Sequence, residues 1–62
     1  MTLQEIADYA MDYLDKHNTP GEYLIYDNCV TVLGDKSSFT HLRLPISRLE
    51  INSMLKRYIL NT

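Results

Sequence analysis

Three side chains in the sequence have the chemistry of a nucleophile, a general base or a soft metal ligand: Cys29, His17 and His41. They show neither CxxC nor HxxxH spacing, so they match no zinc motif. A nucleophilic cysteine needs an adjacent histidine and an oxyanion donor, and His41 is placed at best diagonally across two strands from Cys29. A small apolar role explains Cys29, and His17 falls where a cation complements a helix end. We therefore predict a protein without enzymatic activity, cofactor, bound metal or small-molecule substrate.

Charged residues are distributed unevenly along the chain, although the formal net charge is only −2. The acids up to position 35 are Glu5, Asp8, Asp12, Asp15, Glu22, Asp27 and Asp35, and the one base there is Lys16. From position 36 the bases are Lys36, Arg43, Arg48, Lys56 and Arg57, and the one acid is Glu50. Such regions attract each other within one fold, between two copies, or toward two different partners.

The length of 62 residues provides for a single domain over 1–62 with a small core. Such short domains often depend on disulfides, metals or self-association. One cysteine makes no internal disulfide and the metal spacings are missing, so we expect a homodimer. The N-terminus lacks a secretory leader pattern, and no apolar stretch approaches the roughly 20 residues that span a bilayer. The sequence therefore predicts a cytoplasmic protein that does not contact a membrane.

The N-terminal segment has the start signal and the spacing of an amphipathic helix. Thr2 and Glu5 match a capping box, and the helix is expected from about Leu3 to His17. Its apolar face holds Leu3, Ile6, Ala7, Ala10, Met11 and Leu14, with Tyr13 beside them. The opposite side carries the acidic ridge, which consists of Glu5, Asp8, Asp12 and Asp15. Such a ridge is usually a solvated face, and the functional alternative is docking on a basic surface of a target.

Three strand-like runs follow, over 23–26, 29–33 and 39–44. The Asp27-Asn28 pair separates the first two, and both residues tolerate the positive φ of a type I′ turn. This turn places Tyr26 opposite Cys29. A longer turn over 34–38 leads to the third run, which continues the same two faces if Leu33 pairs with Phe39.

One face of this sheet is the more uniformly apolar. It holds Tyr23, Ile25, Val30, Val32, Thr40, Leu42 and Leu44. A second capping-box pattern at Ser47 and Glu50 predicts a final helix whose apolar stripe is Ile51, Met54, Leu55, Tyr58 and Ile59. The simplest packing puts both helices on the apolar sheet face. The predicted fold class is α+β, with the order α-β-β-β-α: a three-stranded antiparallel meander with two helices packed on one face.

The second sheet face is then left uncovered, although it is not polar. It presents Leu24, Tyr26, Leu33, Phe39, His41 and Arg43. Large apolar patches mark contact surfaces, and Tyr, Phe and Arg are enriched in protein interfaces. Aromatic side chains on a sheet also stack nucleic-acid bases. Phosphate binding, however, needs several Lys or Arg side chains, and Arg43 is the one basic side chain on this face. This surface would not be exposed in two cases: if the face assignment were wrong by one residue, or if a helix covered this side of the sheet.

We therefore expect a small non-catalytic protein that acts stoichiometrically through protein–protein contacts, as a regulator, adaptor or inhibitor. Many small proteins encoded by phages and mobile elements act in this way, and the comparison with them is an analogy at the level of protein class. The alternative function is nucleic-acid binding through the uncovered sheet face and the basic C-terminal half.

Overall fold

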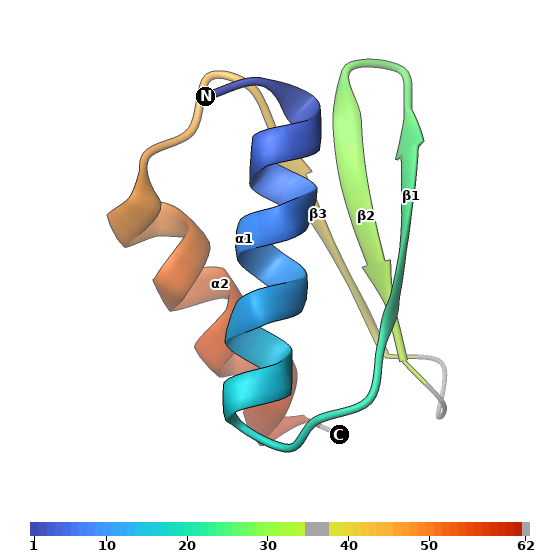
Figure 1. The fold of residues 1–62 in the computed structure, drawn as a ribbon, viewed down its shortest axis with the longest axis vertical. Helices are drawn as coiled ribbons and strands as arrows, with labels where there is room; N and C mark the ends of the chain where they lie inside the picture. Colours follow the sequence, from blue (N-terminus) through green and yellow to red (C-terminus); the bar gives the residue numbers. More distant parts are fainter. Residues whose placement is uncertain (35–37, 62) are drawn as a thin grey trace.

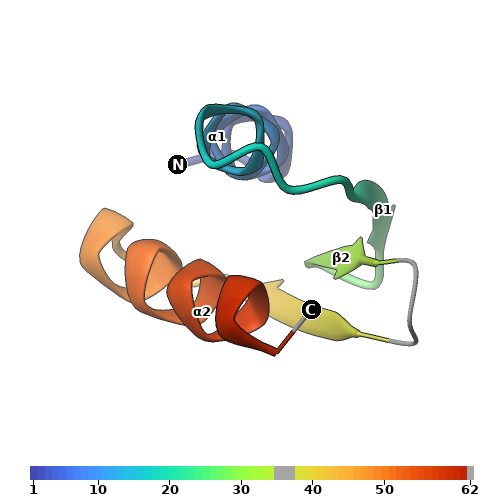
Figure 2. The same ribbon diagram turned by 90° about the horizontal axis from the view of Figure 1, so that it is seen from below.

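The computed structural model describes residues 1–34 and 38–61. Its elements are, in order, α1 (Leu3–Lys16), β1 (Glu22–Tyr26), β2 (Cys29–Leu33), β3 (Phe39–Arg43) and α2 (Arg48–Leu60). The strands form one antiparallel sheet in the order β1-β2-β3 (Figure 1). Figure 2 shows both helices on one side of this sheet, with α1 nearer β1 and α2 nearer β3. The predicted α-β-β-β-α fold is confirmed.

The predicted element boundaries differ from the observed ones by a single residue. His17 caps α1 instead of belonging to it, β1 begins one residue earlier at Glu22, and β3 ends at Arg43. The turn predicted over 34–38 has its central residues, 35–37, outside the described part of the chain. Within 1–34 and 38–61, neither helix has the length and apolarity needed to cross a membrane.

Side-chain caps define where both helices begin. At α1 the predicted capping box is complete: Glu5 N–H donates to Thr2 Oγ1 at 3.1 Å, and Thr2 N–H donates to Glu5 Oε1 at 2.8 Å. At α2 only half of the predicted box forms, because Glu50 N–H donates to Ser47 Oγ while the Glu50 carboxylate accepts from the Ser47 hydroxyl. Both helices therefore begin where the sequence predicts.

The Asp27-Asn28 turn fixes the register of the first hairpin, β1 with β2. Both residues have positive φ, 50° and 61°, as a type I′ turn requires. Tyr26 consequently pairs with Cys29 in the first hairpin, and Leu33 pairs with Phe39 in the second. The predicted Tyr26–Cys29 pairing is confirmed, and the Leu33–Phe39 pairing meets the condition under which the third strand continues the same two faces. The two pairings determine which side chains share a sheet face.

The core lies between the helices and one face of the sheet. Its buried members are Ile6, Ala7, Ala10, Leu14, Val30, Val32, Leu42, Ile51, Leu55 and Tyr58. The prediction was too broad at β1, where Tyr23 and Ile25 point to the helix side but remain 37% and 41% exposed. The helices cover the centre of the sheet fully and its β1 edge only in part.

Candidate functional site

The sheet face turned away from the helices is the largest surface that the sequence singles out. Register assigns to it Glu22, Leu24 and Tyr26 of β1, Cys29, Thr31 and Leu33 of β2, and Phe39, His41 and Arg43 of β3. We name these residues the outer face. Across the strands they form the rows Tyr26–Cys29–Arg43, Leu24–Thr31–His41 and Glu22–Leu33–Phe39.

The apolar side chains of the outer face are open to solvent. Leu24, Tyr26 and Phe39 are 58%, 79% and 60% exposed, and Leu33 is also exposed. His41 and Arg43, which the sequence also predicts here, are exposed beside them. The structure therefore brings all predicted sheet-face residues together on one surface. A face assignment shifted by one residue, and a helix covering this side, are both wrong for this chain.

Polar contacts order part of the outer face. Thr31 Oγ1 and His41 Nδ1 share a hydrogen bond of 2.9 Å, and the His41 ring meets the Phe39 ring edge-on at 5.3 Å between centroids. Arg43 Nη1 donates to the Asp27 carbonyl at 3.4 Å. A surface whose side chains are already held loses less conformational entropy when a partner binds.

Sequence reasoning missed Glu22 as a member of this surface, because it began the first strand one residue later. The signal was present in the alternation, since Glu22 precedes Leu24 and Tyr26 at a spacing of two residues. Glu22 adds a carboxylate at the corner opposite Arg43, so the outer face carries opposite charges at two corners.

Cys29 lies on the outer face but is only 3% exposed. Its Sγ atom is 3.9 Å from both Thr31 Oγ1 and His41 Nδ1. The thiol and the imidazole thus come into contact, diagonally across β2 and β3. The Nδ1 atom of His41 already bonds Thr31, and the larger side chains of Tyr26 and Arg43 flank the thiol in its row. This geometry is that of a packed small side chain, without the access to substrate that a nucleophile needs.

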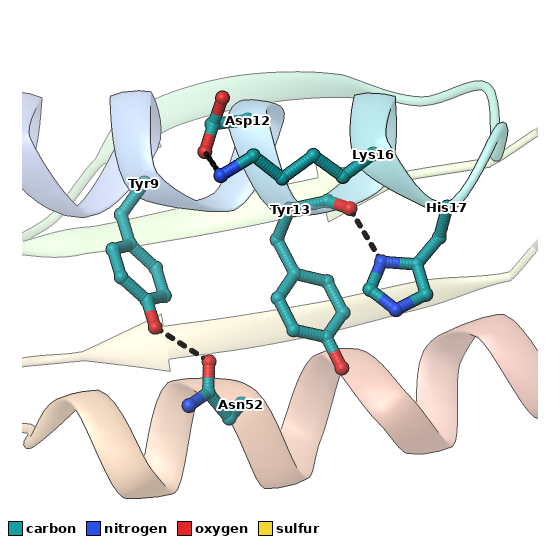
Figure 3. A network of polar contacts seen from close by, with 6 residues as sticks. All are labelled: Tyr9, Asp12, Tyr13, Lys16, His17 and Asn52. Atoms are coloured by element: carbon teal, nitrogen blue, oxygen red, sulfur yellow. Dashed lines mark hydrogen bonds and ion pairs between the residues drawn. The ribbon is translucent and has the colours of Figure 1, made fainter.

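The acidic ridge is exposed along α1, as predicted. Glu5 belongs to the helix cap, where the hydrogen bond from the Thr2 backbone lowers the pKa of its carboxyl. Asp12 forms an ion pair of 3.0 Å with Lys16 one turn later (Figure 3). Asp8 Oδ1 accepts a hydrogen bond from Gln4 Nε2 at 3.0 Å. Three of the four ridge acids thus make contacts within α1 and its cap. Among the described residues, no group of His, Cys, Asp or Glu is arranged to hold a metal ion.

His17 has a structural role at the end of α1. Its Nδ1 donates to the Tyr13 carbonyl at 2.8 Å, and the two rings stack with 4.4 Å between centroids (Figure 3). Figure 3 also shows the Tyr9 hydroxyl donating to Asn52 Oδ1 of α2, at 2.6 Å. His17 therefore completes the helix end, and Tyr9 joins the two helices.

The charge asymmetry of the sequence becomes an asymmetry in space. Most acids of the described residues lie on α1, on β1 and in the turn after it, and Glu50 lies on α2. Apart from Lys16 on α1, the bases Arg43, Arg48, Lys56 and Arg57 lie on β3 and α2. Over the described ranges the one ion pair is Asp12–Lys16, which is internal to α1. No ion pair joins the two halves among the described residues, although, beside the hydrogen bond from the Thr2 backbone, the charge of Arg48 on α2 contributes to the lowered pKa of Glu5 on α1.

The surface also has open hollows. One of about 410 Å³ lies between β3 and α2 and is lined by Ser38, Phe39, Thr40, Met54, Arg57, Tyr58 and Asn61. It extends the outer face past Phe39 to Arg57.

Comparison of the chain with protein-family models, curated proteins and solved structures gives no match. Geometry and chemistry of these surfaces are thus the basis for a functional proposal.

Proposed function

We propose that this chain is a small non-catalytic cytoplasmic protein that acts stoichiometrically through protein contacts, as a regulator, adaptor or inhibitor. The outer face is its contact surface. The observation that supports this most is the exposure of Leu24, Tyr26 and Phe39 on a sheet whose other face is covered by helices. The largest apolar patch on a soluble protein is often a contact surface.

The composition of the outer face also supports protein contact. Tyr26 and Phe39 lie at diagonal corners, and an aromatic side chain buries about 150–250 Å² when it is covered. Together with Leu24 and Leu33 they offer several hundred Å², and a standard interface takes about 800 Å² from each partner. The face is therefore large enough for much of an interface with a second copy of the chain or with another protein.

Nucleic-acid binding is the alternative function for the same surface. Arg57 favours it, because this base borders the hollow beside Phe39. The distribution of the other bases favours protein contact instead. Arg43 is the one base on the outer face and donates to a backbone carbonyl, while Arg48 and Lys56 belong to α2 on the other side of the sheet. A phosphate backbone is bound by several bases along one track.

Tyr26→Ala and Phe39→Ala test the proposal. Each should weaken self-association or partner binding at least about tenfold, as interface aromatics do. Each should change the free energy of unfolding by less than about 1 kcal/mol, because both side chains are exposed. Sedimentation of the purified chain measures self-association, and a pull-down with purified wild-type bait measures partner binding.

Leu49→Ala is the matched control, because Leu49 is 81% exposed on α2, away from the outer face. Its variant should bind as the wild type does. Equal binding by all three variants would remove the outer face as the contact surface. Tight binding of single-stranded or duplex nucleic acid that falls steeply with salt would favour the alternative function.

A further inference from the structure

The outer edge of β1 is a second surface, distinct from the outer face. β1 is an edge strand, since the sheet order is β1-β2-β3 (Figure 1). A two-residue turn closes on a hydrogen-bonded pair, here Tyr26 and Cys29. Hydrogen-bonded and non-hydrogen-bonded pairs alternate along antiparallel strands. The backbone N–H and C=O groups of Tyr23 and Ile25 therefore point away from β2, toward solvent.

The side chains of β1 agree with an edge that has no neighbouring strand among the described residues. Tyr23 and Ile25 face the helix side but are 37% and 41% exposed, whereas Val30 and Val32 on β2 are fully buried on that same side. The strand contains no lysine, no proline and no bulge, which are the usual devices that protect an edge from further pairing. The sequence of β1 therefore leaves its outer edge open to pairing with another strand.

Acidic groups border this edge on its helix side. Gln4 Nε2 donates both to Asp8 Oδ1 at 3.0 Å and to the Tyr23 hydroxyl at 3.4 Å, so Asp8 lies next to the Tyr23 side chain. At the start of β1, an open hollow of about 380 Å³ is lined by Asp12 and Asp15 together with the segment Thr19–Gly21. Lys16, the basic residue of α1, is paired with Asp12 and so does not neutralise Asp8 or Asp15.

We propose that the edge of β1 accepts an extended, basic segment of a partner protein as a fourth strand of the sheet. The backbone of that segment bonds the outward groups of Tyr23 and Ile25. Its side chains alternate between the two faces. Basic side chains fit the helix side near Asp8, and apolar side chains fit the outer side beside Leu24 and Tyr26. An alternating basic and apolar sequence is thus the expected recognition motif.

Charge selects this occupant over a second copy of the chain. Antiparallel pairing of two β1 strands about a two-fold axis at Leu24 would keep both α1 helices on the same side of a continuous sheet. The two acidic borders, each with Asp8, would then face each other across the seam. Like charges so placed disfavour the pairing, whereas a basic segment is attracted to the same border.

A peptide of alternating lysine and valine, capped at both ends, is the probe, and a glutamate–valine peptide is its control. Titration by NMR measures the dissociation constant and locates the site. The lysine peptide should bind at least about tenfold more tightly at low salt, and should shift and protect the amides of Tyr23 and Ile25. Equal affinity for the two peptides, or shifts confined to α2 or β3, would overturn the proposal.

Two variants test the backbone and charge parts separately. Ile25→Pro removes an outward N–H without taking a bond from the β1–β2 ladder, and should weaken binding about three- to tenfold. Asp8→Asn should weaken it about two- to fivefold. Glu50→Gln, on α2, is the matched charge control and should have no effect. If Ile25→Pro does not fold, Asp8→Asn alone decides, and unchanged affinity there refutes the basic preference.

The edge and the outer face are tested independently. Phe39→Ala lies on the far strand and should leave binding of the lysine peptide unchanged, although it is expected to weaken the contact proposed for the outer face. Protection of the Tyr23 and Ile25 amides that grows with protein concentration in the absence of peptide would show pairing between two copies. That result would replace the basic segment as the occupant.

Discussion

At the scale of the residue, the candidates for chemistry in this chain each contact neighbouring parts of the fold. His17 bonds the end of α1 and stacks on Tyr13. Cys29 is packed between larger neighbours and touches His41. Glu5, one of the four ridge acids, is a capping residue. The residue types alone do not distinguish these contacts from a catalytic role. The neighbours of each side chain in the fold are needed for that distinction.

Glu5 gives a pH prediction at this scale. Its pKa is lowered in the folded protein by the hydrogen bond from the Thr2 backbone, so its contribution to stability is complete above its ordinary pKa. That contribution is lost as the pH falls from the ordinary pKa of a glutamate through the lowered pKa of Glu5. Thermal unfolding of wild type and Glu5→Gln should therefore converge as the pH is lowered.

Glutamine is a suitable replacement because it also serves in a capping box but does not titrate. The unfolding midpoints of the two proteins should differ most near neutral pH. A difference that stays constant from pH 7 to pH 3 would show that the carboxylate of Glu5 adds nothing to the cap.

At the scale of the element, the hairpin turn determines the surfaces of the sheet. Asn28 has φ of 61° and Asp27 has φ of 50°, and both values follow from a two-residue connection. A shift of β1 against β2 by one residue would move Leu24 and Tyr26 to the helix side and turn Ile25 to the outer face. The turn is thus responsible for the presence of the outer face.

Substitutions at Asn28 test this. Asn28→Val should lower the free energy of unfolding by about 1–2 kcal/mol, because a β-branched residue is strained at positive φ. Asn28→Gly should stay within about 0.5 kcal/mol of the wild type or exceed it, since glycine adopts this conformation freely. Urea unfolding measures both. Equal stability of the two variants would mean that the turn does not hold the left-handed conformation.

At the scale of the whole molecule, Tyr58 holds together segments that are far apart in sequence. Its hydroxyl donates to the Pro20 carbonyl at 3.5 Å, before β1. It also lies against Gly21 and Gly34, and a Cβ atom at Gly34 would overlap it. Gly34 therefore has no side chain for reasons of space, because Tyr58 from the last helix occupies the position.

Gly34→Ala should consequently lower the free energy of unfolding by about 1–3 kcal/mol, the usual cost of overpacking. Tyr58→Phe removes the overlapping oxygen, so the same glycine substitution should cost less in the Tyr58→Phe background. A double-mutant cycle by urea unfolding measures this coupling. Additive effects would show that Tyr58 and Gly34 do not share this contact.

The whole molecule also places its charges on two sides. Acids gather on α1 and around β1, and bases gather on β3 and α2, without an ion pair between the two sides among the described residues. The sequence left open whether the two halves attract each other within one fold or act outward. Within the described fold Arg48 acts on Glu5 without forming an ion pair, so most charges of the two halves stay available to partners. The proposed basic segment at the β1 edge is one such use.

Local rules in the sequence were sufficient for the elements, the register of the first hairpin and every member of the outer face except Glu22. Capping residues, helical spacing and the Asp27-Asn28 turn each act over a few neighbours, so they can be read without knowledge of the fold. Glu22 was missed because a strand end is determined by pairing with Leu33, which is distant in sequence. Tyr23 and Ile25 were correctly placed on the helix side, but alternation gives only the side of a sheet and not how far a helix extends over it.

The sequence by itself determined which residues form helices and strands and which side of the sheet each strand residue faces, because hydrogen bonding and side-chain direction repeat with a fixed local period. Only the tertiary structure decided that the helices leave the edge of β1 half covered, that Cys29 is packed, and that Asp8 borders Tyr23. These features depend on where whole elements dock, and docking is determined by the summed packing of side chains from distant parts of the chain.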